Sequence, residues 1–257
     1  MSTAKLKIAQ KLKLKKYRDE FKLFVAEGLR LCEMANEIEF GFYTAEFLKN
    51  DRAKNFVEKV KTCATLYEIP AATFEKISDT KTPQGVMLIA RQKFSTMEEI
   101  LQKNLIVALD AVHDAGNLGT ILRTSEAFSC GVVLLEDSAD IFNPKVVRAS
   151  MGAIFNLPVI KMTRTDFLSA MKNSNVEILA AALDSTAEIY YNHDFTEKTA
   201  VIFGSEAAGV SAEILNAAKK IYIPMTGRAE SLNVATAAAI IISEINRKNP
   251  PVLKTKD

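Results

Sequence analysis

The sequence predicts an α/β protein in which a smaller α/β unit precedes a parallel sheet. From Asn104 onward the apolar runs are short and continuous, as in parallel strands that are covered on both faces. Helix candidates alternate with these runs, and this alternation favours a doubly wound sheet. Up to Arg91, helical and strand-like segments also alternate, and the breaker KTPQG precedes the last strand.

The N-terminal unit is expected to end near Arg91. Pro70 ends one of its strands, because proline cannot donate a ladder hydrogen bond. Helix candidates span residues 5–16, 29–37, 53–61 and 72–78, and strand candidates span residues 21–28, 38–45, 65–70 and 85–92. Residues 93–103 are expected to form a connection that contains a short helix.

Six strand candidates and five helix candidates make up most of the remaining chain. The strands are expected over residues 105–110, 131–137, 155–161, 176–184, 199–206 and 221–225. The helices are expected over residues 117–128, 144–152, 165–173, 211–218 and 231–247. Pro144 suits a first helical turn, whereas Asn117 and Ser211 suit helix N-caps. The tail over residues 249–257 is polar and interrupted by prolines.

Composition indicates a globular protein of the cytoplasm. Of 257 residues, 48% are hydrophobic and 25% are charged, as in soluble domains. The longest apolar run, residues 235–243, is well short of the roughly 18–20 residues that span a bilayer. Cys32, Cys63 and Cys130 form no CxxC pair, which favours free thiols in a reducing compartment and disfavours a zinc site. We therefore expect no metal and no membrane association.

Basic residues are concentrated near the N-terminus, although the net charge is only +2. Eight lysines and arginines lie between Lys5 and Lys22, among them Lys11, Lys15 and Arg18. Such a cluster can bind RNA phosphates through counterion release. It equally fits a solvated helix face whose apolar side points inward. Charge alone leaves both interpretations open.

Several common α/β enzyme classes are disfavoured by missing motifs. The first strand of the C-terminal part is not followed by GxGxxG, and GSEAAGVS lacks the lysine of a P-loop. The sequence also lacks HExxH and a GxSxG elbow. Instead, three strand-end loops are polar and rich in small residues. In open parallel sheets such loops bind ligands.

These three loops resemble the signature motifs of the SpoU (TrmH) family of RNA ribose 2′-O-methyltransferases, in the SPOUT superfamily. The matching residues are Asn117, Gly119 and Arg123 in the first motif, Gly204, Glu206 and Gly209 in the second, and residues 223–225, Gly227 and residues 231–234 in the third. The resemblance covers roughly residues 105–246. In the N-terminal half, VAEGLRLCEMA and TPQGVMLIA are similar to the family's ribosomal-protein-like substrate-binding domain.

The resemblance implies a domain order and a cofactor. We expect an RNA substrate-binding domain over residues 1–92, a linker over residues 93–103 and a methyltransferase domain with a deep trefoil knot over residues 104–248. Homodimers are expected to form through the knotted domain. S-adenosylmethionine is the implied cofactor, held by the loops of the second and third motifs. The implied cofactor-binding residues are Gly204, Ile223, Met225, Ser231, Leu232 and Asn233.

Arg123 is the catalytic residue that the resemblance implies. Its guanidinium stays protonated, so we expect it to hold the target phosphate and stabilise developing alkoxide charge rather than act as a base. The alternative is a surface ion pair with Glu126. Asn117 is expected to orient Arg123 or the ribose, or simply to cap a helix. Glu206 is expected to fix a loop or to approach Arg123 of the partner subunit.

The expected reaction is methyl transfer to one ribose 2′-hydroxyl of structured rRNA. Arg148, Lys11, Lys15 and Arg18 are the candidate RNA-binding residues, and Arg148 equally suits an ordinary surface position. The alternatives are a tRNA substrate, transfer to a base nitrogen, or an RNA-binding ribosome-assembly factor without turnover. The sequence departs from the usual family pattern at Ala115, where proline is common, and at Ala235, where serine is common.

Overall fold

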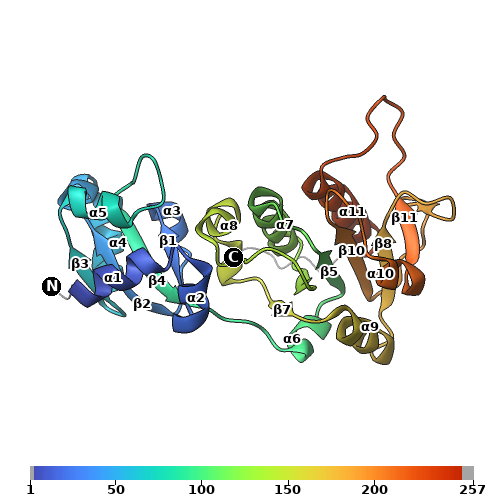
Figure 1. Cartoon of the computed structure of the whole chain (residues 1–257), viewed down its shortest axis with the longest axis horizontal. Helices are drawn as coiled ribbons and strands as arrows, with labels where there is room; N and C mark the ends of the chain where they lie inside the picture. Colours follow the sequence, from blue (N-terminus) through green and yellow to red (C-terminus); the bar gives the residue numbers. More distant parts are fainter. Residues whose placement is uncertain (1–2, 251–257) are drawn as a thin grey trace. The chain divides into compact units, whose positions relative to one another are not determined.

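Residues 3–250 are described by the computed structural model (Figure 1). They form two compact units, of which the first contains residues 3–93 and 140–155 and the second contains residues 94–139 and 156–250. In this described part of the chain, no helix combines the length and apolarity needed to cross a membrane.

The first unit contains a four-stranded mixed sheet in the order β1-β4-β2-β3. Its strands are β1 (Leu23–Glu27), β2 (Ile38–Tyr43), β3 (Thr65–Glu68) and β4 (Val86–Arg91). Strand β4 is antiparallel to β1 and to β2, whereas β2 and β3 are parallel. All four strands lie within the ranges expected from the sequence.

Helices in this unit are short. They are α1 (Thr3–Lys11), α2 (Lys15–Phe21), α3 (Leu29–Cys32), η1 (Ala45–Lys49), α4 (Asp51–Lys61), α5 (Ala71–Ile77), α8 (Pro144–Ala149) and η2 (Ala153–Phe155). The single helix expected over residues 5–16 is therefore wrong, because the chain is extended at Leu14. Arg18 Nη1 donates to the carbonyls of Leu12 and Lys13, at 2.8 and 2.9 Å, and so satisfies acceptors left by the break.

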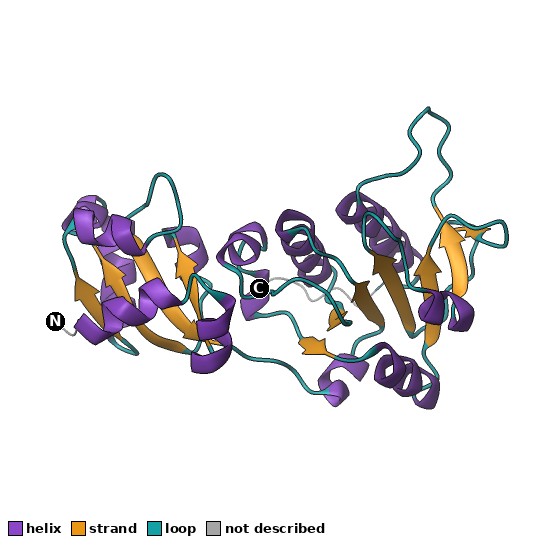
Figure 2. Ribbon diagram, in the orientation of Figure 1, coloured by secondary structure: helices purple, strands orange, loops and turns teal. Residues whose placement is uncertain are grey.

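Helices α1 and α5 cover one face of the four-stranded sheet (Figure 2). The other face carries Phe24, whose ring centroid lies 4.9 Å from that of Phe142 and 5.6 Å from that of Phe155. These aromatic contacts explain why residues 140–155, which the sequence places in the second domain, belong to the first compact unit.

The second unit is built on a seven-stranded sheet in the order β7-β6-β5-β10-β8-β11-β9. Its strands are β5 (Leu105–Asp110), β6 (Gly131–Leu134), β7 (Val159–Lys161), β8 (Glu177–Ala181), β9 (Glu188–Ile189), β10 (Thr199–Gly204) and β11 (Lys219–Tyr222). Every neighbouring pair is parallel. The predicted parallel sheet is confirmed, although the two-residue strand β9 was not predicted.

Helices cover both faces of the parallel sheet. They are α6 (Met97–Leu101), α7 (Ala115–Ala127), α9 (Arg164–Asn173), α10 (Ala212–Ala217) and α11 (Val234–Lys248). Helices α6, α9 and α10 pack on one face around Ile106, Val133 and Ile202. Helices α7 and α11 contact each other and lie on the opposite face (Figure 2).

Strand β10 is inserted between β5 and β8, so the ends of three central strands meet at one edge. The buried carboxylate of Asp110, 1% exposed at the end of β5, stabilises this edge. Its Oδ1 accepts from Arg164 Nε at 2.8 Å, and its Oδ2 accepts from the backbone N–H of Ser211 at 2.8 Å. One side chain thus links β5 to the segments that follow β7 and β10.

The three thiols are expected to differ sharply in reactivity. Burial raises the pKa of Cys32 far above its ordinary range and that of Cys130 to about 12, whereas Cys63 is exposed. Because the thiolate is the reactive form, Ellman's reagent should titrate one thiol in the folded protein at pH 8 and three after denaturation. A second thiol that reacts at the same rate in the folded protein would contradict the burial of Cys32 and Cys130.

Candidate cofactor and catalytic site

A cavity of about 530 Å³ lies beyond the carboxyl ends of β8, β10 and β11. We call it the cofactor cavity. All six residues that the sequence analysis assigned to cofactor binding line it, namely Gly204, Ile223, Met225, Ser231, Leu232 and Asn233. The remaining lining is mostly apolar and includes Phe203, Val210 and Ile241. An apolar cavity with a few polar groups suits a small organic ligand.

Backbone groups along the cavity are available to a ligand. Strand β11 ends at Tyr222, and within residues 3–250 neither Ile223 nor Met225 makes a backbone hydrogen bond. The same holds for Leu232. Amide and carbonyl groups that line an apolar cavity can bind the polar edge of a heterocycle such as adenine. The lining therefore fits S-adenosylmethionine, which the sequence resemblance implies.

Gly204 permits the tight turn at the end of β10. A Cβ atom at this position would lie 2.0 Å from the carbonyl carbon of Gly209. The turn is closed by two hydrogen bonds, from Ser205 N to Gly209 O at 3.1 Å and from Gly209 N to Ser205 O at 2.9 Å. Gly209 itself has a φ of +69°, which favours glycine. The second motif thus forms a compact wall of the cofactor cavity.

Three side chains from the three motifs form one hydrogen-bonded chain. Asn233 Nδ2 donates to Asn117 Oδ1 at 2.9 Å, and Asn117 Nδ2 donates to Glu206 Oε1 at 2.5 Å. Asn233 Oδ1 also accepts from the N–H of Ala235 at 2.9 Å and so caps α11. This Asn233–Asn117–Glu206 chain joins α7, the turn after β10 and the start of α11.

Two expected helix starts need correction. Asn117 is not an N-cap, because Asp114 caps α7 by accepting from Asn117 N at 2.8 Å. The amide side chain of Asn117 is therefore free to join the other two motifs. Helix α11 begins at Val234 rather than at Ser231, since Asn233 supplies its cap. Ser231 remains outside the helix, in the wall of the cofactor cavity.

Arg123 lies on α7, six residues after Asn117, and its side chain is exposed. Within the described residues it forms no hydrogen bond or ion pair, so the alternative pairing with Glu126 is not observed. Arg123 is also not among the residues that line the cofactor cavity. The structure thus brings Asn117, Glu206 and Asn233 together and leaves the guanidinium free for another molecule.

The candidate RNA-binding residues all lie in the first unit. Lys11 is exposed, with its Nζ 4.8 Å from the ring centroid of Tyr17, and Lys15 pairs with Asp19 at 3.0 Å on the surface. Arg148 is half-exposed and pairs with Asp79 at 3.2 Å. These three cations are accessible to a phosphate.

Arg18 is buried, so the expectation that it binds RNA is wrong. Its side chain is 2% exposed and forms an ion pair with Asp140, itself 6% exposed, at 2.8 Å. Its remaining donors are used at the break between α1 and α2. The sequence could not reveal this role, because the partner carboxylate lies 122 residues away.

Replacement of Arg18 is expected to destabilise the first unit. Arg18→Ala leaves the buried Asp140 without its partner, and such a loss typically lowers the free energy of unfolding by about 3–5 kcal/mol. Lys15→Ala removes only an exposed pair and should cost less than about 1 kcal/mol. Urea denaturation followed by circular dichroism would measure both variants. Equal small losses for the two would argue against a buried structural role of Arg18.

Sequence reasoning missed Asp110 and Arg164. In addition to its bond to Asp110, the Arg164 guanidinium pairs with Glu136 at 3.4 Å. The available signal was a carboxylate, Asp110, at the end of an otherwise apolar strand. Within residues 3–250 there is no group of three His, Cys, Asp or Glu side chains that could hold a metal ion.

Family models match both parts of the chain. Residues 104–243 match the SpoU rRNA Methylase family, and residues 3–88 match the MRM3-like substrate binding domain. The chain is 33% identical to the 23S rRNA (guanosine(2553)-2′-O)-methyltransferase RlmP of Bacillus subtilis, over 93% of this chain and 94% of that protein.

Solved structures agree with these matches. An AdoMet-bound rRNA methyltransferase from Sinorhizobium meliloti is similar, with a TM-score of 0.85, 31% identity and 95% coverage of each chain. A protein of the TrmH family from Porphyromonas gingivalis gives a TM-score of 0.83 at 32% identity, with coverage of 96% of this chain and 98% of that one. The predictions of an RNA methyltransferase and of S-adenosylmethionine as cofactor are confirmed. The chain belongs to the SpoU rRNA methylase family.

Proposed function

We propose that this protein transfers the methyl group of S-adenosylmethionine to the 2′-hydroxyl of one ribose in large-subunit rRNA. The single observation that carries the proposal is the convergence of the three motifs at the cofactor cavity, through the Asn233–Asn117–Glu206 chain. The similarity to a 23S rRNA 2′-O-methyltransferase over nearly the whole of both chains supports the rRNA substrate.

The cofactor cavity supplies the binding groups for the methyl donor. The backbone groups at Ile223, Met225 and Leu232 would hold the cofactor, and the turn after Gly204 would exclude water from one side of it. When bound, S-adenosylmethionine supplies an electrophilic methyl group. Because Asn117 and Glu206 are held by hydrogen bonds across the motifs, they require little reorganisation to orient a substrate group.

Arg123 is proposed to act on the RNA. As a free, permanently charged guanidinium, it would bind the phosphate next to the target ribose and stabilise negative charge that develops on the 2′-oxygen. It would not accept the proton, because a guanidinium keeps its charge in proteins and has no free lone pair to act as a base. In this role Arg123 contributes mainly to the chemical step and little to cofactor affinity.

Domain roles, the knot and the dimer are further parts of the proposal. Residues 1–92 would bind rRNA through Lys11 and Lys15, together with Arg148 of the segment 140–155 that belongs to the same compact unit, and residues 104–248 would carry out the transfer. The match of residues 3–88 to a substrate-binding model supports this division. We further propose that the second unit contains a trefoil knot and forms a homodimer, and that the protein acts in the cytoplasm. Sedimentation equilibrium, which measures the mass of the protein in solution, would test whether it is a homodimer.

Radiolabel transfer tests the function directly. The protein is incubated with S-adenosylmethionine labelled at the methyl group and with either rRNA or tRNA that lacks modifications. We expect label in 23S rRNA, in a dinucleotide that resists alkaline hydrolysis because its 2′-oxygen is methylated. Label only in tRNA, or in alkali-sensitive nucleotides, would contradict the proposal. RNA binding without any transfer would favour an assembly factor.

A further inference from the structure

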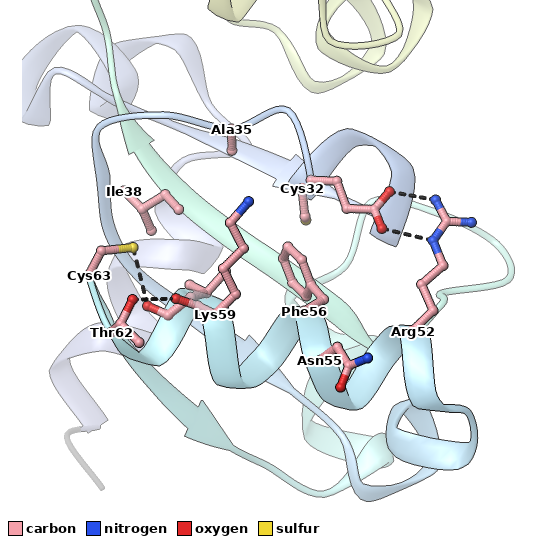
Figure 3. Close-up of a pocket in the computed structure, with 11 residues that line it drawn as sticks. Cys32, Ala35, Ile38, Arg52, Asn55, Phe56, Lys59, Thr62 and Cys63 are labelled. Atoms are coloured by element: carbon pink, nitrogen blue, oxygen red, sulfur yellow. Dashed lines mark hydrogen bonds and ion pairs between the residues drawn. The ribbon is translucent and has the colours of Figure 1, made fainter.

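A groove of about 880 Å³ lies in the first unit, and none of the individual candidate site residues named above lines it (Figure 3). It is bounded by α4, by the end of α3 and by the segment that leads into β2, and we call it the α3–α4 groove. In Figure 3 the side chains of Phe56 and Lys59 point from α4 into the space between α4 and that segment. The three signature motifs contribute no residue to this groove, and it shares no lining residue with the cofactor cavity.

Positive charge exceeds negative charge at the α3–α4 groove. Among the described residues, Glu33 is the one carboxylate that lines the groove, and Arg52 donates to it through Nε at 2.8 Å and Nη2 at 2.5 Å. The pKa of Glu33 is lowered chiefly by the hydrogen bond from Arg52, and Lys59 and Arg30 lower it further. Within the described residues Lys59 forms no ion pair, so its ammonium group is available to an anion.

The floor of the groove is apolar. Phe56 and Val60 are buried on α4, and Ile38 lies opposite them at the start of β2. A simple phosphate site has no need of such a floor. A cationic rim above an apolar floor instead suits single-stranded nucleic acid, whose phosphates meet cations while its bases leave water for an apolar surface.

We propose that the α3–α4 groove binds an unpaired stretch of the substrate rRNA, with a phosphate at Lys59 and a base on the floor formed by Phe56 and Ile38. The inference rests on the proposed function, because it names the RNA feature that the first unit would recognise. Duplex RNA fits the groove poorly, since its bases are stacked and paired and cannot reach a recessed floor.

Cys63 provides a reporter inside the groove. It lines the groove and is the exposed thiol, whereas Cys32 and Cys130 are buried. We expect 23S rRNA and a single-stranded oligouridylate to slow the alkylation of Cys63 by N-ethylmaleimide. A duplex of the same length should leave the rate unchanged. Mass spectrometry of the peptide that contains Cys63 measures the rate.

Two charge reversals on α4 complete the test. Lys59→Glu should abolish the protection of Cys63 and reduce the slope of log K against log salt concentration for rRNA binding by about one. Lys54→Glu is the matched control, because Lys54 is exposed on the same helix, pairs with Asp51 at 3.4 Å and does not line the groove. In the Lys54→Glu variant, RNA should still protect Cys63 from alkylation. Both variants should keep their melting temperature and their affinity for S-adenosylmethionine.

The outcomes separate this inference from the proposed function. If Cys63 in the rRNA complex reacts at the rate of the free protein, and Lys59→Glu binds rRNA normally, the groove proposal is overturned even though methyl transfer persists. If rRNA protects Cys63 but no RNA is methylated, the groove proposal stands and the proposed function fails. Protection by the duplex alone would show that the groove recognises paired RNA instead.

Discussion

Arg123→Ala is expected to reduce methyl transfer to rRNA by at least roughly 10²-fold, the usual loss when one group that stabilises developing charge is removed. Affinity for S-adenosylmethionine should stay within a few-fold of wild type, because Arg123 does not line the cofactor cavity. Stability should also be unchanged, since the exposed guanidinium has no partner among the described residues. Single-turnover kinetics and calorimetric titration of the cofactor measure these quantities separately.

The control for this variant is Arg247→Ala, which removes an exposed arginine paired with Glu244 at 2.7 Å. It should retain full single-turnover activity. Arg123→Lys keeps the charge but loses the forked geometry, so partial activity is expected. Substantial turnover by Arg123→Ala would disprove the assigned role, whereas a large loss of cofactor affinity would show that the residue acts at the cofactor cavity instead.

Gly204→Ala should destroy cofactor binding and destabilise the second unit by about 3 kcal/mol or more, because its Cβ would overlap backbone atoms rather than a flexible side chain. The nearest of these atoms are the carbonyl carbon and oxygen of Gly209, at 2.0 and 2.1 Å, and the amide nitrogen of Val210, at 2.2 Å. The turn that forms one wall of the cofactor cavity would have to open. Thermal unfolding with and without S-adenosylmethionine tests both effects.

Gly227→Ala provides the stability control. Gly227 also lies in a signature motif, but a Cβ there has no atom within 4 Å. The melting temperature of the Gly227→Ala variant without cofactor should match that of wild type. If Gly204→Ala and Gly227→Ala melt alike, and Gly204→Ala still gains stability from the cofactor, the close approach at Gly204 is not what holds the turn.

The central strands were predictable because local patterns determine them, whereas the candidate cofactor residues came from the resemblance of three motifs to a family. Strands β5 and β10 are buried on both faces and therefore have continuous apolar runs. The resemblance implied the roles of Gly204 and Asn233, and these two residues lie in loops that follow strands, where parallel sheets bind ligands. For buried strands such as β5 and β10, the local sequence is therefore enough to predict the secondary structure.

Other features depend on contacts between distant parts of the chain. Strand β9 has only two residues, too few for a periodic signal, and is defined by its pairing with β11. Arg18 sits in a run of exposed lysines, and only its pairing with Asp140 shows that it is structural. Helix α8 fits the pattern of the second domain, yet the packing of Phe142 and Phe155 on Phe24 places its segment in the first unit.

The place of β10 in the sheet constrains the order of events during synthesis. β10 is the sixth of the seven strands of the parallel sheet to be made, but it pairs with both β5 and β8. Until Thr199–Gly204 leaves the ribosome, β5 has one open edge and β8 has no partner from the earlier strands. Nascent chains that stop before β10 would expose unpaired, apolar strand edges, which are prone to aggregation. The second unit therefore cannot complete its sheet before both β10 and β11 (Lys219–Tyr222) have been made.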